Sequence, residues 1–271
     1  MAKLVWDAIG ERYYETGVDR GVVYPQVSGA YPKGEAWNGL ITATISPSGA
    51  EPTALWANNH KYNNLISAEE VAGTIEAYTY PDSFAQCNGE VEAAKGVRFG
   101  QQKRVPFGFT FRTMIGNDTE GNSHGYKIHI IYGATASPSE NSSTTINDSP
   151  EAKTMSWEFN TVPVEVDGFN ALSHIEIDST TADPAKLAEL EAMLYGSESD
   201  EAKLPMPNEI VELMGAALQD GNYGKMLTGK GESIYPEGSS LTISHRACTP
   251  TSSNPTALPH AAPRAKSNAE R

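Results

Sequence analysis

Histidines are the first candidates for chemistry, because imidazole binds metals and transfers protons near neutral pH. They stand at positions 60, 124, 129, 174, 245 and 260. No two of them have the HExxH spacing of a zinc-binding helix, and no CxxC pair accompanies them. His129 and His174 fall on the polar faces of expected strands, where they can meet neighbouring carboxylates, but we favour a solvated strand face as their setting. The histidines therefore predict no metal site.

A glycine-rich segment near the C-terminus approaches the phosphate-binding pattern GxxxxGK[ST]. Residues 224–231 read GKMLTGKG, so Gly231 stands where a hydroxyl is needed to bind Mg²⁺. The segment also follows an expected helix, whereas a phosphate-binding loop follows a strand. We interpret it as a flexible linker.

The sequence gives little support for acid–base or nucleophilic catalysis. Glu69 with Glu70 and Asp118 with Glu120 are paired carboxylates. Glycosidases hold such a pair at a defined gap across a cleft, whereas acidic pairs in turns are usually solvated. The chain has no GxSxG motif, and its two cysteines lie far apart in the sequence. We expect a protein that is not an enzyme and has no catalytic, cofactor-binding or metal site.

Length and charge narrow the class of protein. The chain has 271 residues with 34 acidic and 20 basic side chains, a formal net charge of −14. This length suits one large domain or two small ones. The acidic excess disfavours a surface that coats nucleic acid, because phosphate binding needs clustered lysine and arginine. No stretch approaches the roughly 18 apolar residues that span a bilayer, and no secretion signal is evident, so we expect synthesis in the cytoplasm and no membrane contact.

Alternation of apolar and polar residues with a period of two predicts several strands with one buried face. The strongest segments are 107–112, 126–132, 155–160 and 174–178, and the weaker ones are 40–45 and 74–80. Turn-rich stretches separate these segments. The pattern predicts a mainly β fold, an antiparallel β-sandwich or barrel.

One or two flanking α-helices are expected after the strands. Asp183 is a good N-cap with Pro184 at the first helical position, and Gly196 ends the helix. A second helix is expected to open at Asn208 and end near Gly221.

Residues 1–224 are expected to form the β domain with its helices, and residues 225–271 a flexible tail rich in glycine, proline and serine. The tail carries a net charge of +3, which leaves −17 on residues 1–224. From Thr249 onward it has four prolines and no aromatic residue. Such a segment cannot offset its ordering entropy by burial, so we expect disorder there.

The stretch from Ser46 to Leu65 has no clear periodicity, and we expect a long loop there. It carries Leu55, Trp56 and Tyr62. Long loops in compact domains are usually functional or disordered, and the aromatic residues argue against disorder. Two interpretations stay open: the loop folds over its own sandwich, or it docks on a partner through these three residues.

Several segments share their sequence pattern with one known family. They are YYETGVDRGVVYP (13–25), WNGL (37–40), the loop just described, SAEE (67–70), TIEAYTYPDSFAQCNG (74–89), FGFTFRTMIGNDTEGNSHGYKIHIIYG (107–133), NDSPEAKTMSWEF (147–159) and PVEVDG (163–168). Together they resemble the major tail, or tail tube, proteins of long-tailed bacteriophages (siphophage type). The resemblance covers roughly residues 4 to 214 and stops at about Gly215.

The resemblance implies a structural virion protein. In that family a β-sandwich subunit with a flanking helix forms hexameric rings whose inner sheets join into a barrel, and stacked rings make the tube that conducts the genome. Implied partners are further copies of the chain, the tape-measure protein inside the tube, the tail terminator and distal tail proteins at its ends, and DNA in transit without specific binding. The implied location is the phage tail, after assembly in the host cytoplasm.

Three features suit this assembly. Strands with polar outer faces suit a wall that is wet on its lumen side, and the residues expected to face the lumen are Arg112, Lys127, His129, Glu158 and Glu176. The aromatic loop suits a contact between rings. The acidic balance suits a channel for DNA, because like charge suppresses phosphate binding.

Two other classes stay open. A monomeric β-sandwich binding module or adhesin predicts a monomer in solution with a ligand site at its loop ends. An acidic hydrolase with a carboxylate pair in a cleft predicts turnover of a substrate.

Overall fold

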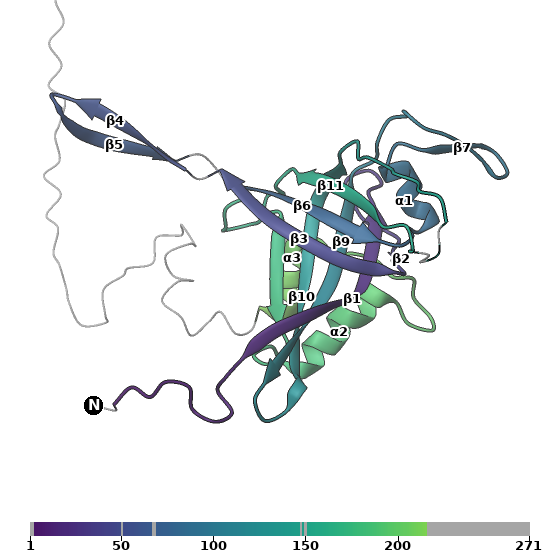
Figure 1. Cartoon of the computed structure of the whole chain (residues 1–271). Coiled ribbons are helices and arrows are strands. Elements are labelled where there is room, and N and C mark those ends of the chain that lie inside the picture. The colour runs from purple at the N-terminus through teal and green to yellow at the C-terminus, as the bar shows by residue number, and fades with distance from the viewer. Residues whose placement is uncertain (1–2, 50, 67–68, 147, 149–150, 216–271) are drawn as a thin grey trace, which may run out of the picture. The chain divides into compact units, whose positions relative to one another are not determined.

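A computed structural model of the chain describes residues 3–49, 51–66, 69–146, 148 and 151–215. Its main feature is one antiparallel sheet of eight strands, ordered β2-β1-β9-β10-β11-β6-β3, with β12 paired to β10 (Figure 1). The strands are β1 (Tyr14–Pro25), β2 (Glu35–Ala36), β3 (Leu40–Gly49), β6 (Glu69–Ala77), β9 (Phe107–Asn117), β10 (Gly121–Ala136), β11 (Met155–Thr161) and β12 (His174–Asp178). The predicted mainly β, antiparallel fold with flanking helices is confirmed.

The sheet curls so that its two halves enclose a common aromatic core. Trp37 lies at the centre of this core, with ring centroids 4.6 Å from Phe84, 5.6 Å from Phe109 and 5.5 Å from Trp157. Phe109 comes from β9 and Trp157 from β11, so the rings join strands from both halves of the sheet. Helix α1 (Asp82–Cys87) supplies Phe84 and Cys87 to this core. Helix α1 was not predicted, because six residues are too few to show a helical period.

The opposite face of β1, β9 and β10 packs against helices α2 (Pro184–Tyr195) and α3 (Pro207–Met214) (Figure 1). Asp183 caps α2 as predicted, since its Oδ1 accepts hydrogen bonds from the backbone N–H groups of Ala185 at 2.9 Å and Lys186 at 3.2 Å. The Tyr24 hydroxyl donates to the Leu194 carbonyl at 2.6 Å, tying β1 to the end of α2. The expected end of the second helix near Gly221, the boundary at 224 and the tail lie outside the described residues.

The loop expected between Ser46 and Leu65 is instead strand and hairpin, which corrects that prediction. Strand β3 pairs with β6 as far as Gly49 opposite Glu69. Beyond it, β4 (Pro52–Ala57) and β5 (His60–Ile66) pair with each other. We call residues 52–66 the ribbon. Asn58 and Asn59 join its strands with φ angles of 50° and 63°, as a type I′ turn requires.

Strand β1 and the hairpin that follows α1 were also not predicted. Strand β1 contains two irregularities of register, between Thr16 and Asp19 and between Asp19 and Val22, which break the period of two. The short hairpin of β7 (Val91–Ala94) and β8 (Val97–Phe99) has mostly exposed side chains, so its sequence shows no buried face.

We predict that Gly73→Ala destabilises the domain strongly. A Cβ at Gly73 would lie 2.2 Å from the Thr44 carbonyl oxygen and 2.4 Å from Cζ of Phe159, whose ring covers the glycine. Neither group can retreat without disturbing the β3–β6–β11 pairing. The free energy of unfolding should fall by on the order of 2 kcal/mol, measured by urea denaturation.

The matched control is Gly100→Ala, where an added Cβ meets no atom within 4 Å. This change should alter stability by less than about 0.5 kcal/mol. Equal stability of the two variants would contradict the close packing of Phe159 on Gly73.

Candidate functional site

The ribbon exposes the three residues that were predicted to form a contact. Trp56 is 69% exposed, Tyr62 71% and Leu55 39%. Within the described part of the chain, β4 and β5 pair only with each other. The described residues therefore give no support to the interpretation in which this segment folds over its own sandwich. Clustered exposed apolar side chains mark interaction surfaces, and an isolated hairpin is only marginally stable in water.

The remaining side chains of the ribbon suit a protein contact. The ribbon contains four asparagines, which can adapt their hydrogen bonds to a partner. It contains no acidic residue, and Lys61 gives it a positive charge. Its chemistry therefore differs from that of the strongly acidic chain around it.

Three of the five residues expected at the lumen meet in one polar cluster: Lys127, His129 and Glu176. Lys127 Nζ lies 2.9 Å from Glu176 Oε1 and also forms an ion pair with Glu15. Hydrogen bonds to Glu15 and Glu176 raise the pKa of Lys127. The cluster brings together β1, β10 and β12.

His129 and His174 form an adjoining pair. His129 Nδ1 is 3.3 Å from His174 Nε2, and the rings stack 8° from parallel. The other nitrogen of His129 is 3.0 Å from the Thr113 hydroxyl, and its ring also stacks on Phe111. His129 is only 7% exposed, which corrects the expectation of a solvated strand face.

Burial lowers the pKa of both histidines below the ordinary value of 6.5. For His129 the neighbouring His174 lowers the pKa further, while the Glu176 carboxylate acts in the opposite direction. The pair therefore resists protonation. This arrangement links β10 to β12, and a single sequence gives no sign that the two histidines pair.

Arg112 and Glu158 do not join this cluster. Arg112 stands opposite Ile128 on β10, whereas Phe111 stands opposite His129, so Arg112 points to the helix-covered face. There it binds Asp19 through two hydrogen bonds of 2.8 and 2.6 Å and lies over the Tyr126 ring. Glu158 is exposed on β11, and its strand neighbours Trp157 and Phe159 point to the core. The prediction that all five share one wet face is wrong, because the sheet is packed on both faces at Arg112.

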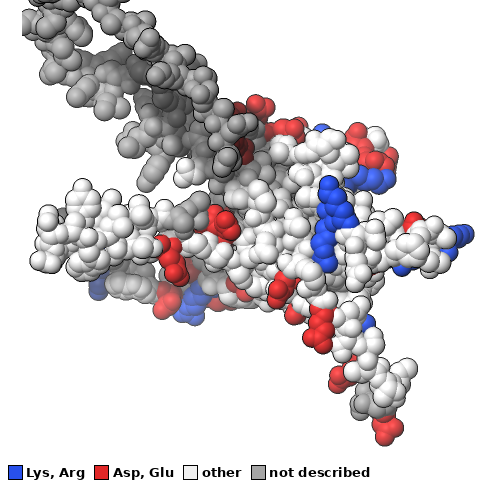
Figure 2. Space-filling model, turned by 90° about the horizontal axis from the view of Figure 1, so that it is seen from above, with Lys and Arg blue, Asp and Glu red and all other residues white. Residues whose placement is uncertain are grey.

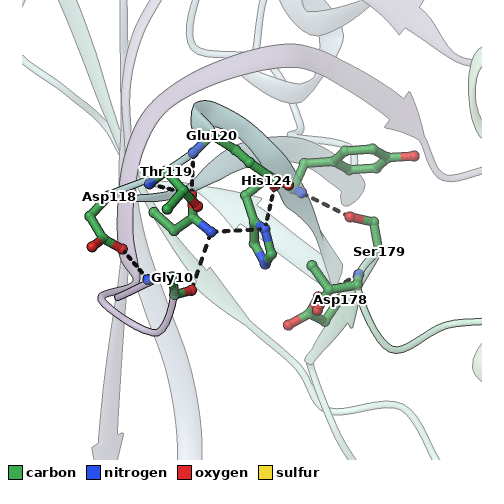
Figure 3. A network of polar contacts seen from close by, with 10 residues as sticks. Gly10, Asp118, Thr119, Glu120, His124, Asp178 and Ser179 are labelled. Carbon is green, nitrogen blue, oxygen red and sulfur yellow. Dashed lines mark hydrogen bonds and ion pairs between the residues drawn. The ribbon is translucent and has the colours of Figure 1, made fainter. Parts of the chain in front are cut away.

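The paired carboxylates considered for catalysis have separate structural roles. Asp118 accepts a hydrogen bond from the Gly10 N–H at 2.9 Å, and Glu120 Oε2 lies 2.8 Å from His124 Nδ1 (Figure 3). In Figure 3 the Asp118 contact fastens the N-terminal segment to the β9–β10 turn, whereas the Glu120 contact joins that turn to the start of β10. Glu69 and Glu70 lie exposed at the start of β6.

A cavity of about 770 Å³ lies beside the polar cluster. Its lining includes Tyr13, Glu15, His124, Lys127 and Asp178. The walls are thus charged as well as aromatic. This cavity was not predicted, because its lining comes from four separate segments of the chain.

The N-terminal segment before Gly10 is a second exposed apolar feature that sequence analysis missed. Its exposed side chains are Leu4, Val5, Trp6 and Ile9. The sequence does contain a sign of this feature, because four large apolar residues fall within six positions and do not alternate as in a strand.

Most of the face shown in Figure 2 is neither acidic nor basic, and both acidic and basic side chains occupy separate spots there. Among the described residues, no group of three or more His, Cys, Asp or Glu side chains is arranged to hold a metal ion. Burial raises the pKa of the Cys87 thiol to about 12, which leaves it a poor nucleophile. No helix in the described segments is both long and apolar enough to cross a membrane.

No protein-family model matches this chain, and no curated protein matches it.

We predict that the histidine pair makes stability depend on pH. The unfolded chain binds protons on these imidazoles near pH 6.5, whereas the folded chain resists them. The free energy of unfolding is therefore highest above that pH and falls as pH falls below it, by up to about 1.4 kcal/mol per pH unit for each proton that differs. Urea denaturation of the unassembled subunit between pH 7.5 and 5.5 measures this slope.

His129→Gln should reduce the slope, because it removes one buried imidazole. The matched control is Gly100→Ala, which leaves both imidazoles in place and should keep the slope of the parent. Identical slopes in the parent and in His129→Gln would rule out the histidine pair as the cause.

Proposed function

We propose that this chain is the subunit of a bacteriophage tail tube, a structural virion protein whose hexameric rings stack into the conduit for the genome. In this proposal the subunit is made in the host cytoplasm and ends in the phage tail. Its partners are its own copies, the tape-measure protein in the lumen, and the terminator and distal tail proteins at the tube ends.

The exposed ribbon is the observation that carries this proposal. It lies between β3 and β6 in the chain and carries apolar side chains that the described residues do not cover. Covering Trp56, Tyr62 and Leu65 with a neighbour would remove a large apolar area from water. A repeating assembly of identical subunits provides such a neighbour for every ribbon.

The sheet has a feature that supports ring formation. Strand β3 is the last in the strand order, so its outer edge is free for pairing within the described sheet. Antiparallel edges recruit strands from other chains unless charge, proline or a bulge prevents it. On β3 the proline, Pro47, and the register shift between Leu40 and Thr42 both lie outside residues 43–46, so this stretch is the part of the edge that can pair. Pairing between neighbouring copies would join their sheets into a continuous barrel.

The charge of the chain supports a conduit for DNA. Residues 1–224 carry a net charge of −17. A wall of that sign repels phosphates, so DNA can pass without being held. Specific DNA binding would need clustered basic side chains, and the face in Figure 2 shows only isolated ones.

We predict that the purified protein forms sixfold rings and tubes. Heterologous contacts repeat from copy to copy and so build rings and stacks. Negative-stain microscopy and light scattering over a range of protein concentration measure the assembly. A monomer at every concentration, with no tubes at virion-like salt, would favour the monomeric binding module instead.

We predict that Trp56→Ala weakens stacking and leaves the subunit folded. Interface energy concentrates in buried aromatic anchors, so the loss should be on the order of 2 kcal/mol per contact. The critical concentration for tube growth should rise accordingly, measured by sedimentation of tubes. The melting temperature of the unassembled subunit should stay nearly constant, because Trp56 is 69% exposed.

Trp56→Phe is the conservative control, since it keeps an aromatic anchor and should restore most of the stacking. An unchanged critical concentration in Trp56→Ala would remove Trp56 from the interface. A melting temperature several degrees lower would instead assign Trp56 a structural role.

A further inference from the structure

A second cavity, of about 350 Å³, lies where β1 and β2 meet the end of α2. We call it the arginine cavity. Apart from Arg20 and Tyr195, its lining consists of small or apolar residues, among them Gly21, Gly34, Ala36 and Ala202. The described residues that line it include no carboxylate, whereas the cavity of about 770 Å³ has acidic side chains in its wall. The guanidinium of Arg20 is therefore the one charged group in this lining.

A bulge in β1 directs Arg20 to this place. From Asp19 to Val22 strand β1 advances three residues while its partner β9 advances two. Within this bulge Arg20 has a φ of 50°, a left-handed conformation that is costly for a residue with a Cβ. Bulges commonly re-aim a side chain, and here the guanidinium carbon lies 5.6 Å from the centre of the Tyr195 ring. The fold thus holds an arginine in a strained conformation in the wall of a cavity.

Arg20 has no acidic partner within the described part of the chain. The carboxylate of the adjacent Asp19 is held by Arg112 through two hydrogen bonds. Glu191, one turn before the end of α2, forms no ion pair with Arg20 either. The chain has 34 acidic and only 20 basic side chains, so an arginine without a carboxylate beside it is unusual. Its N–H groups are left to bind an oxyanion.

The hydroxyl of Tyr195 is a second donor without a partner. It is buried and makes no hydrogen bond among the described residues. Burial raises the pKa of Tyr195 to about 12, so the hydroxyl keeps its proton at neutral pH. The positive charge of Arg20 acts on this pKa in the opposite direction, which places the two groups within electrostatic reach of each other. A buried donor without an acceptor is costly, and a ligand oxygen would satisfy it.

We propose that the arginine cavity binds a carboxylate that carries a small apolar group, with the guanidinium of Arg20 as anchor and the hydroxyl of Tyr195 as second donor. A guanidinium matches the two oxygens of a carboxylate in one plane. The single negative charge of a carboxylate balances one arginine, whereas a phosphate dianion would add uncompensated charge to a domain that already carries −17. The small lining residues leave room for a short aliphatic group. This site does not depend on the proposed assembly.

Ligand-observed NMR tests the proposal on the full chain, assembled or not. Saturation-transfer difference spectra are recorded with sodium butyrate, which replaces sodium chloride at constant ionic strength. The proposal expects saturable binding of butyrate and binding about tenfold weaker for butyramide, which has nearly the same shape and no charge. Two peptides distinguish the sources of the carboxylate: acetyl-Ala-Ala-Val with a free C-terminus, and acetyl-Ala-Glu-Ala amide. A peptide that displaces butyrate assigns the site to a chain end or an acidic side chain of another protein, and displacement by neither assigns it to a small free acid.

Variants locate the binding. Arg20→Gln keeps a long polar side chain without the charge and should weaken butyrate binding about tenfold. Tyr195→Phe keeps the ring and should weaken it several-fold. The matched control is Lys95→Gln, which removes one positive charge from the exposed turn between β7 and β8 and should bind butyrate as the parent does.

Equal binding of butyrate by the parent and by Arg20→Gln would overturn the proposal, and so would absence of saturable binding to the parent. If Arg20→Gln does not fold, the comparison of butyrate with butyramide on the parent decides, because equal binding of the two shows that no charge is recognised. Tube formation is measured separately, so failure of this site leaves the proposed function untouched.

Discussion

Strands β1, β9 and β10 are packed on both faces, and the rest of the structure depends on this constraint. Side chains alternate along a strand, so β1 and β10 supply apolar groups both to the aromatic core and to helices α2 and α3, whereas β9 supplies its phenylalanines to the core and the polar Thr110 and Arg112 to the helix side. A polar side chain on such a strand needs a partner, because an unpaired buried polar group is costly. Arg112 forms hydrogen bonds with Asp19, and His129 forms hydrogen bonds with Thr113 and His174. These contacts in turn fix β12 against β10 and hold the irregular stretch of β1 in register with β9.

The same packing leaves the ribbon without cover from its own domain. Both faces of the central strands are already occupied, one by the aromatic core and the other by helices α2 and α3. Its conformation is nevertheless well defined locally, because two successive residues with positive φ form its turn and its strands pair along most of their length. The ribbon thus has a formed shape and an unsatisfied apolar surface, a combination typical of a segment that completes its burial in an assembly.

The sequence predicts those strands of the fold in which apolar and polar residues alternate without interruption. The segments around Phe109, Ile130, Trp157 and Ile177 are strands as predicted, because each alternates against a core. The ribbon shows no such period, since neither of its faces is buried in the chain itself, and β1 loses its period at two irregularities of register. Alternation places Arg112 and His129 on polar faces, but burial of those faces depends on partners far away in the sequence. The histidine pair spans 45 positions, and a single sequence contains no trace of that contact.

Electrostatics also bears on how copies of this chain can associate. Residues 1–224 carry −17 charges, so identical subunits repel one another at long range. At physiological ionic strength this repulsion is screened over about 8 Å, and apolar burial acts only at contact. Cohesion between subunits therefore has to come from short-range apolar contacts at segments that bring no further negative charge. The ribbon, without an acidic residue and with Trp56 and Leu65 exposed on opposite faces, meets both conditions. Stacking should therefore strengthen as salt is added. Salt weakens the repulsion between the acidic subunits and leaves the apolar contact of the ribbon intact.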